Sequence, residues 1–241
     1  MLKALSVPSF ILHKRNYRES SLLLDVLSRD YGRVNLIAKG AKRNKKQQSS
    51  AFEIYQPYSI SWVAKTELGT LTDIETDKTI IKLDNKQVFF VFYMNELIIN
   101  LLHKHEPHPE LFDFYYQTLI DMSENKNEEA TLRYFEKNLL QSLGYGLVLT
   151  TEIESGEIIQ PGLMYSYHLD MGPKLKTDNE NASINLAGET LLQLESENLV
   201  GIERLREARH LCRSALARYL GNKQLKSREL YNAFINTGTS A

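Results

Sequence analysis

The spacing of apolar residues changes at about residue 85, and this change constrains the fold more than any other feature. Before it, five short segments are rich in strand-forming residues or alternate between polar and apolar ones. They are residues 9–13, 21–27, 33–38, 58–63 and 68–74. Five short strands within about 80 residues suit a small barrel. We therefore expect an α+β protein that begins with a five-stranded barrel.

From Asn85 onward, apolar residues recur at helical spacing. Amphipathic helices are predicted at residues 110–122, 128–143, 187–197, 202–220 and 227–234, after a first helix that begins near residue 85. The segment 147–185 has no such period and contains Pro161-Gly162 and Gly172-Pro173, which favour turns and short strands. We expect two domains, a barrel over residues 1–80 and a mainly helical domain over 81–241 that includes this irregular segment.

Charge is segregated along the chain, although the net charge is only −1. Residues 1–66 carry 12 Lys and Arg against 4 Asp and Glu, and residues 201–230 carry 8 against 3. The stretch between them, 67–200, carries 9 against 23. Two basic zones separated by an acidic body indicate a surface that binds a polyanion.

The densest basic stretch lies at residues 39–46, directly after a predicted strand, and five of its eight residues are basic. Such a loop would contact phosphates without reading sequence, and its binding would depend on salt. The predicted phosphate-binding residues of the barrel are Arg15, Arg18, Arg33, Lys39, Lys42, Arg43, Lys45 and Lys46. Tyr17 and Tyr31, which lie in predicted turns, are the candidates for stacking on bases. Phe52 and Trp62 are expected in the core instead.

The predicted helix 202–220 has an apolar stripe and a basic strip. The stripe consists of Leu205, Ala208, Cys212, Ala215, Leu216 and Tyr219. Beside it lie Arg206, Arg209 and Arg213, and the basic zone continues through Lys223, Lys226 and Arg228. We assign these six basic residues to polyanion binding as well. The alternative is a solvated helix face next to the core.

Motifs of enzyme chemistry are weak. Asp73, Glu75 and Asp77 share one strand face and would suit a metal-dependent nuclease, although polar strand faces are usually only solvated. His103, His105 and His108 do not have a spacing that favours zinc. The sequence contains no phosphate-binding glycine loop, dinucleotide motif or zincin motif. We therefore expect a protein that is not an enzyme and holds no metal or cofactor.

The cellular setting is indicated by two features. Cys212 is the single cysteine and cannot form an internal disulfide, which fits a reducing cytoplasm. No apolar run approaches the roughly 18–20 residues of a membrane span. A cytoplasmic protein without membrane contact is expected.

Seven stretches are informative when they are taken together. They are Leu12–Val26, Gly32–Arg43, Gln56-Pro-Tyr58, Asn95-Glu-Leu97, Leu132–Glu136, Leu143-Gly-Tyr-Gly146 and Tyr219–Leu230. In this order they resemble the RecO family of bacterial DNA-repair proteins. Each is modest alone, but their order and spacing cover nearly the whole chain. The resemblance implies an N-terminal barrel of the oligonucleotide/oligosaccharide-binding (OB) fold and a helical domain. It also implies a small zinc-finger-like insert at 147–185, which lacks cysteines here, so zinc is not expected.

The resemblance further implies a recombination mediator. Members bind single- and double-stranded DNA and anneal complementary strands. With the protein RecR they help to load RecA onto strands coated by single-strand-binding protein (SSB), and they bind the acidic, phenylalanine-ended SSB tail. An RNA-binding barrel protein is the main alternative, because base stacking does not distinguish DNA from RNA.

Arg133 is the candidate for contact with the SSB tail. It is the only arginine between residues 67 and 200, and it lies beside Tyr134 and Phe135 within one of the resembling stretches. A helical arginine beside apolar rows could bind a terminal carboxylate. The alternative is an ordinary intrahelical pair with Glu136.

Overall fold

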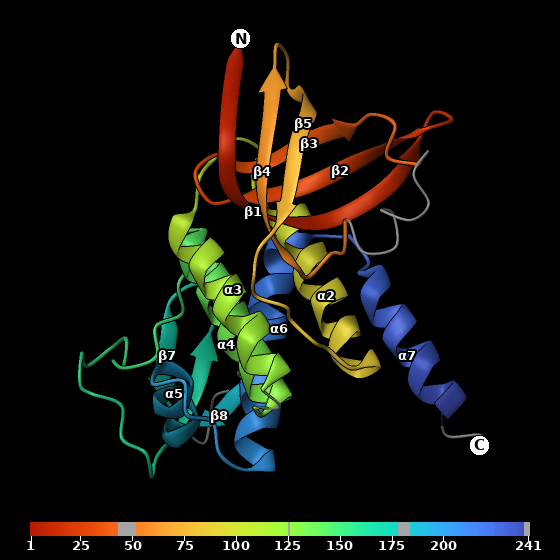
Figure 1. The fold of residues 1–241 in the computed structure, drawn as a ribbon. Helices are drawn as coiled ribbons and strands as arrows, with labels where there is room; N and C mark the ends of the chain where they lie inside the picture. Colours follow the sequence, from red (N-terminus) through yellow and green to blue (C-terminus); the bar gives the residue numbers. More distant parts are fainter. Residues whose placement is uncertain (43–51, 125, 178–183, 239–241) are drawn as a thin grey trace. The chain divides into compact units, whose positions relative to one another are not determined.

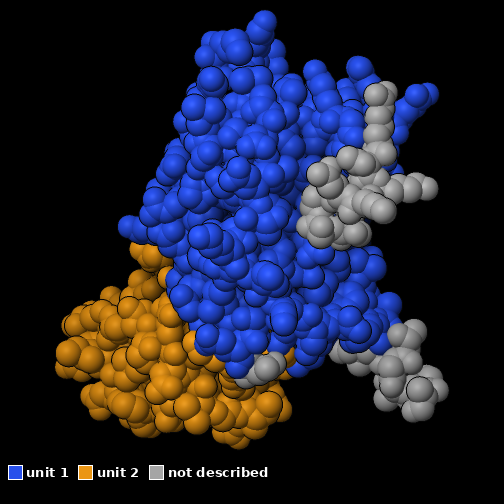
Figure 2. Space-filling model, viewed as in Figure 1, with its two compact units in different colours: residues 1–124, 224–241 blue, residues 125–223 orange. Residues whose placement is uncertain are grey.

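The computed structural model describes residues 1–42, 52–124, 126–177 and 184–238 of the chain (Figure 1). These residues form two compact units (Figure 2). Unit 1 consists of residues 1–124 and 224–241, and unit 2 consists of residues 125–223.

Unit 1 contains a closed five-stranded barrel in the order β1-β2-β3-β5-β4. Its strands are β1 (Leu2–Tyr17), β2 (Ser21–Ser28), β3 (Gly32–Ala38), β4 (Pro57–Ala64) and β5 (Leu68–Thr76). All neighbours pair antiparallel except β3 and β5, which are parallel. In β3, residues alternate between buried and half-buried, because inward side chains fill a small barrel. The expected OB-type barrel is confirmed.

The barrel closes because β1 is long enough to pair with two neighbours. Its first half, from Leu2 to Phe10, pairs with β4, and its second half, from Ser9 to Tyr17, pairs with β2. The register shifts in both halves, and Ser6 within the first shift has a positive φ of 47°. Such bulges increase the local twist that a strand needs to turn a barrel corner.

Two helices pack on the outside of β1. They are α2 (Asn85–Leu101) and α3 (Pro109–Ser123). The ring of Phe10 lies 5.2 Å from that of Phe112 and 5.0 Å from that of Tyr115. Asn95 of α2 ties the three elements together, since its Nδ2 donates to the Leu12 carbonyl at 2.9 Å and its Oδ1 accepts from the Tyr115 hydroxyl at 2.7 Å.

Helix α7 (Lys226–Gly238) belongs to unit 1 and packs on α2. Its first turn is capped by the Glu96 carboxylate of α2, which accepts hydrogen bonds from the backbone nitrogens of Lys226 and Ser227, both at 2.9 Å. A carboxylate at a helix N-terminus satisfies donors that have no partner within the helix. The C-terminal helix thus returns to the unit that holds the barrel.

Unit 2 is a helical body with a small sheet. It contains α4 (Glu128–Ser142), α5 (Gly188–Glu195), α6 (Ile202–Leu220), β6 (Met164–His168), β7 (Gly172–Leu175) and β8 (Asn185–Ala187). The sheet has the order β7-β6-β8 and is antiparallel. Buried residues of the sheet, such as Tyr165 and Leu186, share one core with Leu191 of α5 and Cys212 of α6.

The cysteine-free insert is shaped by a carboxylate in the segment before β6. Glu152 Oε2 accepts a hydrogen bond from the backbone nitrogen of Glu154 at 3.0 Å and from the Ser155 hydroxyl at 2.6 Å. These hydrogen bonds, that of the Ser155 hydroxyl above all, lower the pKa of the Glu152 carboxyl below its ordinary value. Among the described residues, no group of three or more His, Cys, Asp or Glu is placed to hold a metal ion. Turns and short strands occur here, as expected.

The compact units divide the chain differently from the expected division at residue 80. That boundary falls within unit 1, because α2 and α3 pack on the barrel wall and α7 returns to α2. The irregular segment 147–185 lies wholly in unit 2.

Candidate nucleic-acid interface

A cavity of about 800 Å³ lies at the end of the barrel where β1 turns into β2. Its lining consists of Tyr17, Arg18, Glu19, Ser20, Ser21, Ile37, Lys39, Gly40 and Thr70. Strand pairing brings these residues together, since Tyr17 pairs with Ser21 and Ile37 pairs with Thr70. The backbone nitrogen of Lys42 donates to the Ser20 carbonyl at 3.0 Å, which holds the segment after β3 against the β1–β2 turn.

Five predicted DNA-binding residues gather at this end of the barrel, and we call them the turn-end site: Arg15, Tyr17, Arg18, Lys39 and Lys42. Arg15 and Tyr17 are two residues apart on β1 and therefore face the same side. Arg15, Arg18 and Lys39 are exposed, whereas Tyr17 and Lys42 are half-buried. That these five residues bind DNA stays a prediction.

The β1–β2 turn positions Arg18 beside Tyr17. Arg18 has a φ of 52°, and its guanidinium carbon lies 5.3 Å from the centroid of the Tyr17 ring. This is the range of a cation–π contact. The Lys42 ammonium donates to the Arg18 carbonyl at 3.3 Å, so the turn and the segment after β3 support each other. An aromatic face and several cations are thus presented together.

This arrangement suits a single nucleic-acid strand. Exposed guanidinium and ammonium groups neutralise phosphates, and a tyrosine ring offers a surface for stacking. Glu19, Ser20 and Ser21 also line the cavity, and sequence reasoning did not single them out. Their polar groups could hydrogen-bond base edges. The only sequence signal for them was their position in a turn next to two arginines.

Three residues of the predicted basic loop, Arg43, Lys45 and Lys46, lie outside the described residues. Their part in DNA binding stays a prediction.

Tyr31 and Arg33 lie near the opposite end of β2 from the turn-end site. The Tyr31 ring packs edge-on against buried Trp62, with centroids 5.1 Å apart, and it adjoins the barrel core. Arg33 donates to the Leu102 carbonyl at 3.2 Å and lies 3.9 Å from the Asp25 carboxylate. Burial lowers the pKa of the Arg33 guanidinium. The sequence analysis expected both side chains to be exposed for contact with DNA. In the structure, Tyr31 packs against Trp62 and Arg33 contacts Leu102 and Asp25.

The arginine strip on α6 is partly engaged. Arg206 and Arg213 are exposed. Arg209 pairs with Glu129 of α4 at 2.6 Å. A surface pair of this kind contributes about 0–1 kcal/mol, so a phosphate could displace Glu129. The expected core stripe of this helix is buried from Ala208 to Leu216, but Tyr219 at its end is 38% exposed.

The remaining basic residues of this zone are divided between the units. Lys223 is exposed in unit 2, and Lys226 is exposed at the start of α7 in unit 1. Arg228 is half-buried, with its guanidinium carbon 5.4 Å from the centroid of the Tyr93 ring. Lys223 thus belongs to unit 2, whereas Lys226 and Arg228 belong to unit 1.

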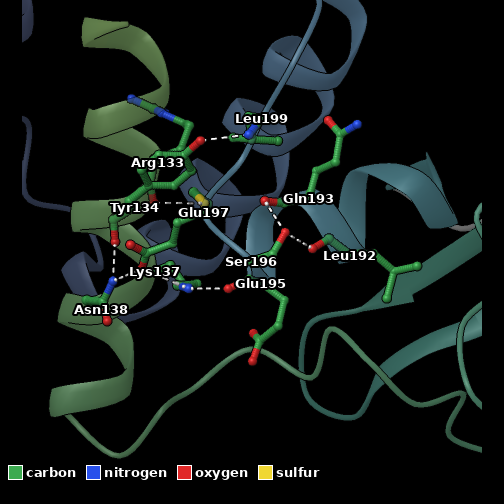
Figure 3. Close-up of polar contacts among 11 residues, drawn as sticks. Arg133, Tyr134, Lys137, Asn138, Leu192, Gln193, Glu195, Ser196, Glu197 and Leu199 are labelled. Carbon is green, nitrogen blue, oxygen red and sulfur yellow. Dashed lines mark hydrogen bonds and ion pairs between the residues drawn. The ribbon is translucent and has the colours of Figure 1, made fainter. Parts of the chain in front are cut away.

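Arg133 is buried inside unit 2, with 3% of its surface exposed. Its Nη1 lies 2.8 Å from Oε2 of buried Glu136, so the intrahelical pair that was the alternative expectation is present. In Figure 3 its helix faces the segment after α5, where the Leu199 backbone nitrogen donates to the Tyr134 hydroxyl at 2.7 Å. Lys137 also anchors this segment, because its Nζ donates to the Glu195 carbonyl at 3.0 Å. The sequence analysis expected Arg133 to be accessible to a peptide, whereas the structure buries it.

The alternative nuclease site is not supported by geometry. Asp73, Glu75 and Asp77 are exposed on or just after β5. Neither they nor any other described residues form a group of three or more side chains placed to hold a metal ion. No helix in the described part of the chain is long and apolar enough to cross a membrane.

Comparison with known proteins decides the family. A sequence model described as recombination protein O N terminal matches residues 3–79, and one described as recombination protein O C terminal matches residues 83–229. This chain belongs to the RecO family. Similar relatives named DNA repair protein RecO come from Methylococcus capsulatus, Nitrosospira multiformis and Coxiella burnetii, each 38% identical. The matches cover 93%, 94% and 92% of this chain and 92%, 94% and 96% of those proteins, respectively.

Two of the stretches that carry the family resemblance have structural roles in unit 1. Gln56 pairs with the backbone of Ile81, donating to its carbonyl at 2.7 Å and accepting from its nitrogen at 3.2 Å. Asn95 joins α2, α3 and β1, as described above. Buried amides that satisfy backbone groups contribute to the fold and carry no information about the ligand.

Proposed function

We propose that this protein is a recombination mediator in DNA repair that binds single- and double-stranded DNA and anneals complementary strands. The observation that carries this proposal is the turn-end site on an OB-type barrel, in a chain that belongs to the RecO family. Its cations neutralise phosphates on any sequence, which is what annealing of arbitrary strands requires. No covalent chemistry is needed, so the protein acts without catalysis.

The annealing step follows from charge neutralisation. Two strands repel each other because each carries one negative charge per nucleotide. Arg18 and Lys39, which line the cavity, and exposed Arg15 on β1 would lower this repulsion on one strand while leaving its base edges free to pair. Tyr17 would hold a base by its face, which leaves the Watson–Crick edge available.

Annealing of two complementary labelled strands coated by SSB tests this proposal. We expect the protein to accelerate duplex formation well above the spontaneous rate, and a triple variant Arg15→Glu/Arg18→Glu/Lys39→Glu to lose most of that acceleration. Magnesium should produce no shortened strand. Cleavage would favour the nuclease, and preference for an RNA strand over DNA of the same sequence would favour the RNA-binding alternative. An annealing rate equal to the spontaneous rate would contradict the proposal.

We also propose that the protein works with RecR to load RecA onto strands coated by SSB. The family membership supports this step. Its test is RecA filament formation on SSB-coated DNA with this protein, with RecR, and with both. Acceleration only when both are present is expected, and acceleration by RecR alone would contradict the proposal.

Binding of the SSB tail at Arg133 remains part of the proposal, although the buried guanidinium would have to exchange Glu136 for the tail carboxylate. Arg133→Ala alone is a poor test, because it leaves a buried carboxylate that destabilises the fold. The double variant Arg133→Met/Glu136→Leu removes both charges with similar volume. It should bind a labelled tail peptide at least about tenfold more weakly, the loss expected for one charge-assisted hydrogen bond. DNA affinity should be unchanged, and unchanged peptide affinity would refute the assignment.

A further inference from the structure

Two tyrosines on the surface of unit 2 stack on each other. The ring centroids of Tyr145 and Tyr219 lie 3.9 Å apart, and their planes differ by only 15°. Tyr145 is 48% exposed and Tyr219 is 38% exposed. Tyrosine rings are usually buried in a core or an interface, yet much of the surface of these two rings is exposed to solvent. A parallel, exposed pair of rings presents a flat aromatic face.

The backbone holds this pair in position before any ligand binds. Tyr145 follows the end of α4, where Gly144 has a φ of +81° and its nitrogen donates to the Gln141 carbonyl at 3.0 Å. The Tyr145 nitrogen donates to the Leu140 carbonyl at 2.9 Å. These two bonds make the Schellman motif that ends many helices. Tyr219 lies in the last turn of α6. Because each ring is already packed on the other, a ligand would cost little side-chain entropy.

Two basic residues lie close to Tyr219 in the sequence. Arg218 precedes Tyr219, and its side chain is 41% exposed in an ion pair with Asp170, which is itself 70% exposed. Exposed pairs of this kind contribute little, so a phosphate can compete for the guanidinium. Lys223 is exposed three residues after α6. Cations beside an aromatic face match the phosphates and the flat bases of a nucleic acid.

The geometry favours a single strand over other ligands. In a duplex both faces of nearly every base are covered by neighbouring bases, so a ring cannot stack on them without unstacking. A single strand can turn a base onto an aromatic side chain. An acidic peptide would also find cations here, but an exposed flat face offers an aromatic side chain no enclosing pocket.

We propose that Tyr145 and Tyr219 form a stacking platform for a base of single-stranded nucleic acid, with Arg218 and Lys223 beside it for the phosphates. This site lies in unit 2 and is additional to the turn-end site of the barrel. It rests on the proposed binding of single strands and assigns that activity a second contact, one that selects unpaired bases by their exposed faces.

Alanine and phenylalanine variants test the platform. Tyr145→Ala and Tyr219→Ala should each weaken binding of a fluorescent oligo(dT) by roughly 5- to 150-fold, the equivalent of about 1–3 kcal/mol for one stacked base. Tyr145→Phe and Tyr219→Phe keep the ring and should bind like the unchanged protein. Binding of a blunt duplex should not change. The loss should be the same at low and high salt, because stacking releases no counterions. Leu175→Ala, at another exposed apolar position of unit 2, is the matched control and should have no effect.

A fluorescent residue at the platform reports stacking directly. In Tyr219→Trp, emission should be quenched by oligo(dT) but not by duplex. The native Trp62 is 1% exposed inside the barrel and serves as a constant background. Thermal unfolding of each variant shows whether its fold is intact.

The outcomes separate the platform from the proposed function. If the unchanged protein fails to bind oligo(dT), the proposed function itself is wrong. If the unchanged protein binds oligo(dT) and the alanine variants bind it equally well, the platform is wrong and the function stands. The same holds if the alanine variants bind oligo(dT) and the duplex more weakly to the same extent. If the alanine variants lose binding of an acidic, phenylalanine-ended peptide but keep binding of oligo(dT), the platform is also overturned, in favour of a peptide site.

Discussion

At the scale of single residues, buried polar side chains of this protein satisfy backbone groups. Gln56 pairs with both backbone groups of Ile81, and Asn95 reaches the Leu12 carbonyl. Glu152 gathers donors of the turn that follows it. Removing such a side chain leaves backbone groups without a partner, which costs about 1–3 kcal/mol when they are buried.

Glu152→Gln should destabilise unit 2 in a pH-dependent way. The folded state lowers the pKa of this carboxyl, so its contribution is present above the ordinary pKa and is lost as the pH falls through the folded value. At neutral pH the variant should be less stable by about 1 kcal/mol, the scale of a hydrogen bond to a surface turn. As the pH falls below the ordinary carboxyl pKa and through the lowered folded pKa, the difference should shrink toward zero, because the wild-type carboxyl then becomes protonated as well. Urea unfolding at several pH values measures this.

Glu157→Gln is the matched control, because Glu157 is exposed in the same segment. It should be neutral throughout. A stability difference for Glu152→Gln that stays constant with pH would show that the charge of Glu152 contributes nothing.

At the scale of elements, close approach of backbone segments fixes the barrel end near β3. Gly32 has a φ of +66°, and a Cβ there would lie 2.1 Å from the Glu106 carbonyl oxygen. The His105 nitrogen donates to the Arg33 carbonyl at 3.0 Å in the same region. Only glycine fits both the backbone conformation and the space.

Two glycine variants separate these effects. Gly40 has a similar φ of +71°, but nothing lies within 4 Å of its Cβ position. Gly40→Ala should cost roughly 1–2 kcal/mol for the left-handed backbone alone. Gly32→Ala should cost clearly more, because the Glu106 backbone must move. Chemical denaturation of both variants checks this, and equal losses would show that the 105–106 segment shifts freely.

Most elements could be predicted from the sequence, because apolar periodicity is a local property. The helix 202–220 was predicted with the bounds that the structure has, and β3 differs by one residue. The prediction for β1 covered only residues 9–13 of Leu2–Tyr17, because its bulges and its basic second half break the alternation. The pairing of β1 with both β2 and β4 is a tertiary feature that the periodicity of one segment does not reveal.

The candidate site was predictable only in part. Charge density selected Arg18, Lys39 and Lys42, which the structure places at one end of the barrel. It also selected Arg33, which donates to the Leu102 carbonyl. Arg133 was selected as the only arginine between residues 67 and 200, and the structure pairs it with buried Glu136. The helical wheel placed Tyr219 in the core, because it considers one helix and not the end of α4 that Tyr145 extends. Reasoning from the sequence misses such contacts wherever residues from other elements determine the environment of a side chain.

At the scale of the whole molecule, the charge zones of the sequence do not correspond to the compact units. The basic zone of residues 1–66 lies in unit 1, but the second zone is split between units after Lys223. Both units therefore carry basic residues of these zones. The cysteine-free insert of unit 2 is built from packing and hydrogen bonds among its described residues.

The purified protein should hold less than one zinc ion per chain, and a chelator should leave its melting temperature unchanged. A structural zinc site contributes to folding, and its removal would lower that temperature. Metal analysis and thermal unfolding with and without chelator check this. One tightly held zinc ion per chain would contradict the prediction and would direct attention to His103, His105, His108 and His168.

The central claim is that single strands bind at the turn-end site, and the salt dependence of affinity tests it most directly. Anisotropy of a labelled oligo(dT) gives the dissociation constant over a range of salt concentrations. The triple variant Arg15→Glu/Arg18→Glu/Lys39→Glu should bind more weakly and should flatten the log–log slope by roughly 0.7 for each phosphate that is no longer neutralised. The control Lys65→Glu/Lys78→Glu/Lys82→Glu makes the same change in net charge at exposed positions of unit 1 outside the site. Its slope should stay close to that of the unchanged protein. Equal slopes for both triple variants would contradict the account.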